Sequence, residues 1–302
     1  MKLSASVDSY LFDGNLPTTT RRWYKQKLDA WLDWMRSAGL SDTSEVTWAT
    51  VLGFQQHLLT LSSEQYKRPL SSHTVHGYLR SLRAYCRWAV AEELVDAKVL
   101  TKWKMPKQEA SVITPFTRDH INRMLRAARE QEDTSLAERD EAIIYLLLDT
   151  GIRASELLGL TLENTHLDHE DAHIRVLGKG SKWREVGLGR TSRKALHRYI
   201  HRFRPNSTAP QVFLSRRGES LTVEGIDHML YRLRERGDIT GVRCSCHTFR
   251  HTYALQYISS GGDVVRLSRL LGHTSLAVTM EYLKQFQSWD ARNGKSIVDE
   301  MF

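Results

Sequence analysis

The segment from residue 101 to residue 117, TKWKMPKQEASVITPFT, constrains the fold of this chain more than any other stretch. It contains two prolines and three lysines and shows no hydrophobic periodicity, which is typical of a linker. A chain of 302 residues is also long enough for about two domains of ordinary size. We therefore expect a first domain over residues 1–107, a linker around 101–117, and a second domain over 108–302 that ends in a tail, 288–302.

The first domain is predicted to consist of helices. The stretch RRWYKQKLDAWLDWMRSAG has apolar residues close to helical spacing and ends at Gly39, a common stop signal. The stretch SSHTVHGYLRSLRAYCRWAVAEE opens with a capping serine, Ser71 or Ser72, and has one apolar face. Another face of this helix carries three arginines, which are Arg80, Arg83 and Arg87. A face of this kind is most often simply solvated, and contact with DNA is the functional alternative.

The charge of the chain favours a polyanionic partner. The net charge is +8 and the isoelectric point is near 9.4. Residues 1–107 hold 15 Lys and Arg against 10 Asp and Glu, a net charge of +5, so basic charge is denser in the smaller domain. This distribution is expected of a domain that grips a phosphate backbone, so a nucleic acid is a candidate partner, although many basic proteins bind nothing charged.

Other features exclude whole classes of protein. The first 15 residues lack the apolar core of a signal peptide, and no stretch approaches about 18 consecutive apolar residues, so we expect no membrane contact. Three cysteines are too few for a disulfide framework in a chain of this length. A soluble protein in a reducing compartment is expected, cytoplasmic and associated with the nucleoid.

The second domain is predicted to be helical with a small antiparallel sheet. AERDEAIIYLLLDTG reads as a buried core helix that stops at Gly151, and IRASELLGL as a short helix that starts at Arg153. AHIRVLGKGSKWREVGL alternates like two strands around a turn that carries Lys179. Further helices are expected over 222–236, 247–259 and 263–271, and in the stretch AVTMEYLKQF.

The stretch RCSCHTFRHTYA, residues 243–254, raises the question of a metal site. Cys244 and Cys246 are only one residue apart and adjoin His247, whereas structural zinc needs a supporting loop between its ligand pairs. His247 and His251 lack the glutamate that follows the first histidine in zinc hydrolases. The alternative is that His247 and Arg250 face a phosphodiester together, since a guanidinium fits two phosphate oxygens and an imidazole can move a proton. We favour this second interpretation and expect no metal.

The functional interpretation of His247 and Arg250 depends on other residues at fixed places in the chain. The full set, in sequence order, is Arg153, Lys179, His247, Arg250, His273 and Tyr282. In this order, with nine residues from His273 to Tyr282 and LLGH before the last histidine, the sequence resembles the tyrosine recombinases of the phage integrase and Xer family. The resemblance is close over residues 113–285 and looser in the N-terminal half. It implies a two-domain, C-shaped clamp around duplex DNA. It also implies a site-specific recombinase that cleaves and rejoins DNA through a 3′-phosphotyrosine intermediate.

The residue types also suit this chemistry. A phenolic oxygen, that of Tyr282, can carry the broken strand as a phosphotyrosine ester. The guanidinium groups of Arg153 and Arg250 can stabilise the negative charge that develops on the phosphate oxygens, and the Lys179 ammonium can protonate the leaving 5′ oxygen. The resemblance further implies that His247 accepts the tyrosine proton and that His273 donates a hydrogen bond to the phosphate. No cofactor and no ATP are expected.

Less specific interpretations remain open for several residues. Glu156 lies three residues after Arg153, which is the spacing of a simple ion pair on a helix. Lys182 is the rival of Lys179 in the same hairpin, and His251 is expected to be structural. Phe249 stands where the family usually has leucine, and VGL at 186–188 stands where VPL is common. These departures concern the local shape of the hairpin and not the catalytic groups.

The resemblance also implies an assembly. Four copies of the chain would form a homo-tetramer on two synapsed sites. The tail, 288–302, would dock on a neighbouring copy, and the alternative is that it covers the core of its own chain. Accessory DNA-bending or recombination-directing proteins are further candidate partners. Two rival functions share the same sequence features. One is a type IB topoisomerase, which rejoins the same strand, and the other is a catalytically silent DNA-binding accessory protein.

Overall fold

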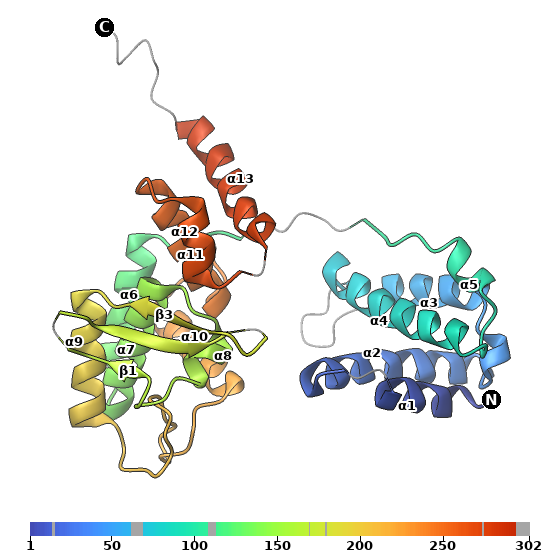
Figure 1. Cartoon of the computed structure of the whole chain (residues 1–302), viewed down its shortest axis with the longest axis horizontal. Helices are drawn as coiled ribbons and strands as arrows, with labels where there is room; N and C mark the ends of the chain where they lie inside the picture. The colour runs from blue at the N-terminus through green and yellow to red at the C-terminus, as the bar shows by residue number, and fades with distance from the viewer. Residues whose placement is uncertain are drawn as a thin grey trace, which may run out of the picture. The chain divides into compact units, whose positions relative to one another are not determined.

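The computed structural model describes the chain except for residues 14–15, 62–68, 108–112, 169, 179, 274 and 294–302, and at residues 19 and 285–293 it describes only the backbone. The chain divides into two compact units, Met1–Ser111 and Val112–Phe302 (Figure 1). The expected domain boundary, between residues 107 and 108, falls at the edge of a segment outside the described residues, and it stays a prediction.

The first unit consists of helices packed around α4. Its elements are α1 (Leu3–Asp13), α2 (Thr18–Ser37), the short 3-10 helix η1 (Thr43–Glu45), α3 (Trp48–Thr60), α4 (Ser72–Ala91) and α5 (Lys98–Thr101). Helix α4 contacts α1, α2, α3 and α5 through its buried face. Ser71 is its cap and accepts a hydrogen bond from the Thr74 amide, which decides between the two serines expected there. Helix α1 was not expected as a separate element.

The second unit is mostly helical. Its helices are α6 (Arg118–Arg129), α7 (Thr134–Thr150), α8 (Ala154–Leu158), α9 (Arg190–Arg198), the π-helical turn η2 (Tyr199–Phe203), α10 (Val223–Arg236), α11 (Cys246–Ser259), α12 (Val264–Leu271) and α13 (Leu276–Asn293). Helix α7 lies at the centre and contacts α6, α9, η2 and α11. The helices expected over 222–236, 247–259 and 263–271 are present, whereas α9 and η2 were not expected.

A three-stranded antiparallel sheet covers part of the same unit (Figure 1). Its strands are β1 (Thr165–His166), β2 (His173–Leu177) and β3 (Trp183–Gly187), in the order β1-β2-β3. The hairpin pairs Ile174 with Val186 and Leu177 with Trp183. The predicted hairpin is therefore present, and the prediction of a mostly helical fold with a small antiparallel sheet is confirmed. The C-shaped clamp concerns the relation between the two units and stays a prediction.

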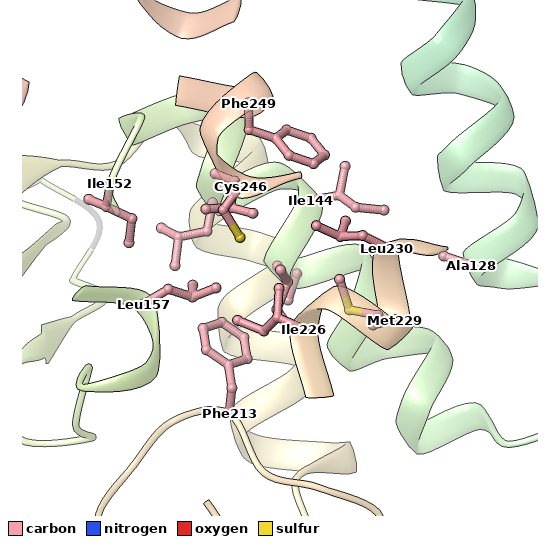
Figure 2. Packing of buried hydrophobic residues seen from close by; sticks show 14 of the residues in the cluster. Ala128, Ile144, Ile152, Leu157, Phe213, Ile226, Met229, Leu230, Cys246 and Phe249 are labelled. Carbon is pink, nitrogen blue, oxygen red and sulfur yellow. The ribbon is translucent and has the colours of Figure 1, made fainter. Parts of the chain in front are cut away.

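The core of the second unit forms where the sheet, α7, α10 and α11 bury their apolar side chains. Figure 2 shows Phe249 and Cys246 of α11 in the same cluster as Ile144 of α7 and Leu230 of α10. Phe249 and Leu230 are completely buried. Phe249, the departure from the leucine usual in the family, therefore serves as a core residue that fixes α11 against the rest of the unit.

Two helices end at glycines in the left-handed conformation, and both ends lie at the candidate site. Helix α7 ends at Gly151 (φ 59°), as the sequence predicts, and α12 ends at Gly272 (φ 61°). A side chain other than hydrogen costs energy in this conformation, which is why glycine ends helices so often. The last carbonyl groups of a helix have no partner within it and carry partial negative charge. The chain thus brings to the same region two sets of carbonyl oxygens that have no partner within their own helix.

Candidate active site

Arg250 lies between the ends of α7 and α12. Its Nη1 donates to the Gly151 carbonyl at 2.9 Å, and its Nη2 donates to the Leu271 carbonyl at 2.8 Å. The residue is only 4% exposed. Burial and the nearby Arg153 charge together lower the pKa of Arg250 to about 10. The guanidinium nevertheless stays charged at neutral pH, so a positive charge is fixed at the junction of the two helix ends.

Arg153 joins Arg250 at the end of α12. It is the residue before α8, and its Nη2 donates to the Gly272 carbonyl at 3.1 Å. Its Nη1 donates to Glu156 Oε1 at 3.0 Å, so the simple ion pair that the sequence left open does form. Its side chain remains 33% exposed, so part of it is accessible to a ligand. The structure therefore brings together the two arginines that the sequence singled out.

Glu156 is the buried anion of this cluster, and Arg184 of β3 is its second partner. Arg184 donates Nη1 to Glu156 Oε1 at 2.6 Å and Nη2 to Oε2 at 2.9 Å. Burial alone would raise the pKa of Glu156, but the hydrogen bonds from Arg184 and from the Arg153 amide, with the charges of both arginines, lower it below its usual range. The carboxylate is therefore ionised and bonded to two arginines, and the charge of the third, Arg250, also interacts with it. The cluster carries a net charge of +2 and suits an anionic ligand such as a phosphodiester.

Tyr282 lies beside this cluster, between two histidine rings. It is on α13, is 8% exposed, and shares a small core with Leu267 and Leu271 of α12. The His273 ring is stacked on it, with centroids 6.0 Å apart and planes 7° apart. The His251 ring lies on it at 5.3 Å with a tilt of 42°. The candidate nucleophile is thus held by aromatic contacts within its own unit.

Both histidines beside Tyr282 are neutral at pH 7. Burial, together with the charges of Arg250 and Arg153, lowers the pKa of His273 to about 4. Burial also lowers the pKa of His251 to about 4, with a further contribution from His247. A neutral imidazole has one nitrogen that donates and one that accepts, so each ring can accept one hydrogen bond and donate another without carrying a charge. His251, expected to be structural, is 1% exposed and in direct contact with Tyr282.

His247 occupies the first turn of α11, three residues before Arg250, and its side chain is exposed. Protein atoms that displace water from the ring lower the pKa of His247, and the charges of Arg250 and Arg243 lower it further. The ring is therefore mainly neutral at pH 7 and free to accept a proton. The predicted pair of His247 and Arg250 lies on one helix, as the spacing requires.

Lys179 lies outside the described residues, so its role as proton donor stays a prediction. Its rival, Lys182, is exposed just before β3, where its carbonyl accepts a hydrogen bond from the Gly178 amide at 2.8 Å.

The cysteines near His247 both pack against the apolar core of the second unit. Cys246 lies in the core among apolar side chains (Figure 2). Burial raises the pKa of the Cys246 thiol to about 12 and that of the Cys244 thiol to about 11, so neither forms a thiolate at neutral pH. In the part of the chain that the structure describes, no three His, Cys, Asp or Glu side chains form a group that can hold a metal ion.

The three candidate DNA-binding arginines all lie on α4 of the first unit. Arg80 and Arg87 are exposed and Arg83 is half-buried. The Arg80 guanidinium lies 4.9 Å from the centre of the Trp23 ring of α2, a cation–π distance. The face is therefore basic with an aromatic support, and its contact with DNA stays a prediction.

The sequence did not single out Arg184 as a site residue. The sequence feature that could have identified it is the alternation of β3, where Arg184 and Val186 share the inward face of the strand. A charged residue at an inward position requires a buried partner, and Glu156 had already been noted for another reason.

Comparison with known proteins gives the class of the chain. Residues 115–288 match the family model described as the phage integrase family, and residues 19–105 match the phage integrase SAM-like domain. The chain belongs to the phage integrase family. Its relatives include a protein named Tyrosine recombinase XerC of Neisseria meningitidis, 33% identical over 289 residues that cover 93% of this chain and 91% of that protein. Tyrosine recombinase XerC of Oceanobacillus iheyensis is 30% identical and covers 93% and 92%.

Solved structures share the fold. The XerH site-specific recombinase in a post-cleavage complex with difH substrate matches with a TM-score of 0.71 and 19% identity, over 92% of this chain and 80% of that one. A lambda integrase dimer bound to a COC′ core site matches with a TM-score of 0.71 and 17% identity, over 92% and 97%. Together with the curated relatives, these matches confirm the predictions of a tyrosine recombinase family member and of a site-specific recombinase. Among the described residues, no helix is long and apolar enough to cross a membrane.

Proposed function

We propose that this chain cleaves and rejoins double-stranded DNA with Tyr282 as its nucleophile. The Tyr282 oxygen attacks the scissile phosphorus, the bond to the 5′ oxygen breaks, and a 3′-phosphotyrosine ester forms. His247 accepts the phenolic proton, and Lys179 gives a proton to the leaving 5′ oxygen. The free 5′ hydroxyl of a partner strand then attacks the ester, which restores both the DNA and Tyr282 without ATP.

The observation that carries this proposal is the contact of Tyr282 with His273 beside the arginine cluster. The two rings stack at 6.0 Å, and the charges of Arg250 and Arg153 act on His273. A phosphate held by these two guanidinium groups would lie next to the phenol. Charge that develops on its oxygens in the transition state would meet donors that are already fixed by helix-end carbonyls, and preorganised donors of this kind contribute most to catalysis.

The assembly belongs to the same proposal. Four copies of the chain would synapse two sites and exchange strands in pairs, with the tail, 288–302, docked on a neighbouring copy. Residues 294–302 lie outside the described residues. The first unit would grip DNA through Arg80, Arg83 and Arg87, and accessory DNA-bending or recombination-directing proteins would be further partners. A protein with this task would act on the nucleoid in the cytoplasm.

The test is the formation of a covalent adduct. Wild-type protein and Tyr282→Phe are incubated, with a chelator present, with nicked duplexes tiled across the DNA that flanks the gene. We expect a denaturant-stable protein–DNA adduct with wild type and none with the variant. Adducts that survive Tyr282→Phe would identify another nucleophile. Adducts whose strand never transfers to a second duplex would instead favour a topoisomerase-like activity, and tight binding without any adduct would favour a silent accessory protein.

A further inference from the structure

We infer that Arg184 is a positioning residue of this active site, which neutralises Glu156 and thereby leaves Arg153 free to bind the scissile phosphate. The inference rests on the proposed function, because it gives Arg153 a phosphate to bind.

The end of α12 shows how Arg184 belongs to the site. Three consecutive carbonyl groups there each accept a hydrogen bond from a different arginine. Leu270 accepts from Arg184 Nε at 2.9 Å, Leu271 from Arg250 Nη2 at 2.8 Å, and Gly272 from Arg153 Nη2 at 3.1 Å. His273 follows directly in the sequence. Arg184 is therefore one of three guanidinium groups that fix the helix end from which His273 extends.

The donors of Arg184 face the protein rather than a ligand. Its two terminal nitrogens fork onto the two oxygens of the Glu156 carboxylate, and its Nε is bonded to Leu270. Its side chain is 13% exposed, against 33% for Arg153. A planar guanidinium bound at both ends in this way holds its partners in place. We therefore assign Arg184 to positioning and Arg153 to the phosphate.

The charge of Glu156 explains why a second partner is needed. Its side chain is 1% exposed, and a buried carboxylate is costly unless it is fully paired. With Arg184 present, Arg153 gives the carboxylate one Nη1 hydrogen bond and its backbone amide. Without Arg184, Arg153 would be the only arginine among the described residues that is hydrogen-bonded to the carboxylate, and it would be drawn fully onto it. The net charge of the cluster would also fall from +2 to +1.

The close approach of Gly272 to the Arg184 guanidinium supports the same inference. A Cβ atom at Gly272 would lie 3.0 Å from Arg184 Nη1 and 3.1 Å from its Cζ, which is closer than ordinary contact. The backbone of the α12 end therefore approaches the guanidinium face directly. Arg184 therefore connects β3 to the end of α12, directly before His273.

The experiment compares four variants in the full chain: Arg184→Gln, Glu156→Gln, the double variant, and Arg175→Gln. Arg175 is the matched control, since it lies in the same hairpin but is exposed and pairs with Glu185 at 3.6 Å. The rate of adduct formation is measured at saturating nicked duplex, together with DNA affinity and the melting temperature. We expect Arg184→Gln to lower the rate roughly 10- to 100-fold with little change in affinity, as is typical of residues that orient a catalytic group.

The double variant decides how Arg184 acts. With Glu156 also neutral, Arg153 is no longer drawn away, so the double variant should form the adduct about tenfold faster than Arg184→Gln. The double variant also keeps the test valid if Arg184→Gln alone fails to fold, because it buries no unpaired charge. A folded double variant as slow as Arg184→Gln would overturn the inference, as would wild-type activity in Arg184→Gln.

A second readout needs no DNA and separates this inference from the proposed function. The modification of Arg153 by phenylglyoxal is followed by mass spectrometry of its peptide. We expect Arg153 to react several-fold more slowly in Arg184→Gln, where Glu156 holds it, and to react at the wild-type rate or faster in the double variant. Equal Arg153 reactivity in all variants would overturn the inference. Absence of any wild-type adduct, by contrast, would count against the proposed function alone.

Discussion

The Nδ1 atom of His273 lies 2.7 Å from the hydroxyl oxygen of Thr279. Thr279 is completely buried on α13, three residues before Tyr282. The helix that carries the candidate nucleophile therefore also orients the histidine stacked on it. Where the hydroxyl donates to Nδ1, the ring proton lies on Nε2, the nitrogen left to donate to a phosphate oxygen.

This contact predicts the effect of two substitutions at one position. Thr279→Val keeps the branched shape but removes the hydroxyl, so it should lower the rate of adduct formation about tenfold or more while DNA affinity is unchanged. Thr279→Ser retains the hydroxyl and should stay close to wild type. In a His273→Ala background, Thr279→Val should have little further effect, because the group that it orients is gone. A wild-type rate in Thr279→Val would show that the contact has no catalytic role.

His251 predicts a pH dependence of stability. Its pKa is lowered by burial to about 4 in the folded chain, against about 6.5 for an unperturbed histidine. Between these values the unfolded chain binds more protons, so stability is fully present above pH 6.5 and is lost as the pH falls toward 4. The loss from this one group should be about 2 kcal/mol between pH 7 and pH 5.

The measurement is urea unfolding of wild type and His251→Gln at the two pH values. Histidines 247 and 273 also have lowered pKa values and contribute with the same sign, so the difference between the two proteins isolates His251. The variant should lose less stability on acidification. The same pH dependence in both proteins would mean that His251 does not titrate as described.

The surroundings of Gly151 predict that a residue with a side chain does not fit at the end of α7 without strain. A Cβ atom there would lie 2.6 Å from Cδ1 of Tyr253, and the residue has a φ of 59°. Gly151→Ala should therefore lower the free energy of unfolding by about 2 kcal/mol or more and slow adduct formation, because the Gly151 carbonyl holds Arg250. Gly187→Ala is the control, since open space surrounds that position, and it should change stability by less than about 0.5 kcal/mol. Equal effects of the two substitutions in urea titrations would contradict this interpretation.

Much of the fold was predictable because its signals are local. The stop at Gly151, the hairpin around residues 178–182 and the helix that carries His247 and Arg250 all follow from short patterns of spacing and turn residues. Strand β1 has only two residues, which is too short for a pattern. Helix α9 has mostly basic residues and no capping side chain, so its buried Ala195 and Leu196 did not stand out.

The candidate site was predictable as a set of residues but not as a network. The resemblance supplied its members, and the ion pair of Arg153 with Glu156 follows from their spacing. Arg184 contacts Glu156, which is 28 positions away in the sequence, and Leu270, which is 86 positions away. Contacts over such separations depend on how β3 packs against α8 and α12, which no local pattern encodes.

The basic face of α4 predicts a change in the salt dependence of DNA binding. If Arg80 and Arg87 contact phosphates, each substitution by alanine should reduce the slope of log affinity against log salt concentration by about 1. Arg36→Ala is the control, because Arg36 is an exposed arginine of the same unit that pairs with Asp33 at 2.9 Å. Fluorescence anisotropy at several salt concentrations measures the slopes. Slopes that do not distinguish these arginines from Arg36 would mean that the face is only solvated.

The most direct test of the account is to identify the amino acid that is joined to DNA. The adduct of wild-type protein with a nicked duplex is digested with trypsin and nuclease, and the modified peptide is sequenced by mass spectrometry. The account predicts a nucleotide linked through its 3′ phosphate to Tyr282, in the peptide from α13. A nucleotide joined to any other residue, or one linked through its 5′ phosphate, would contradict it.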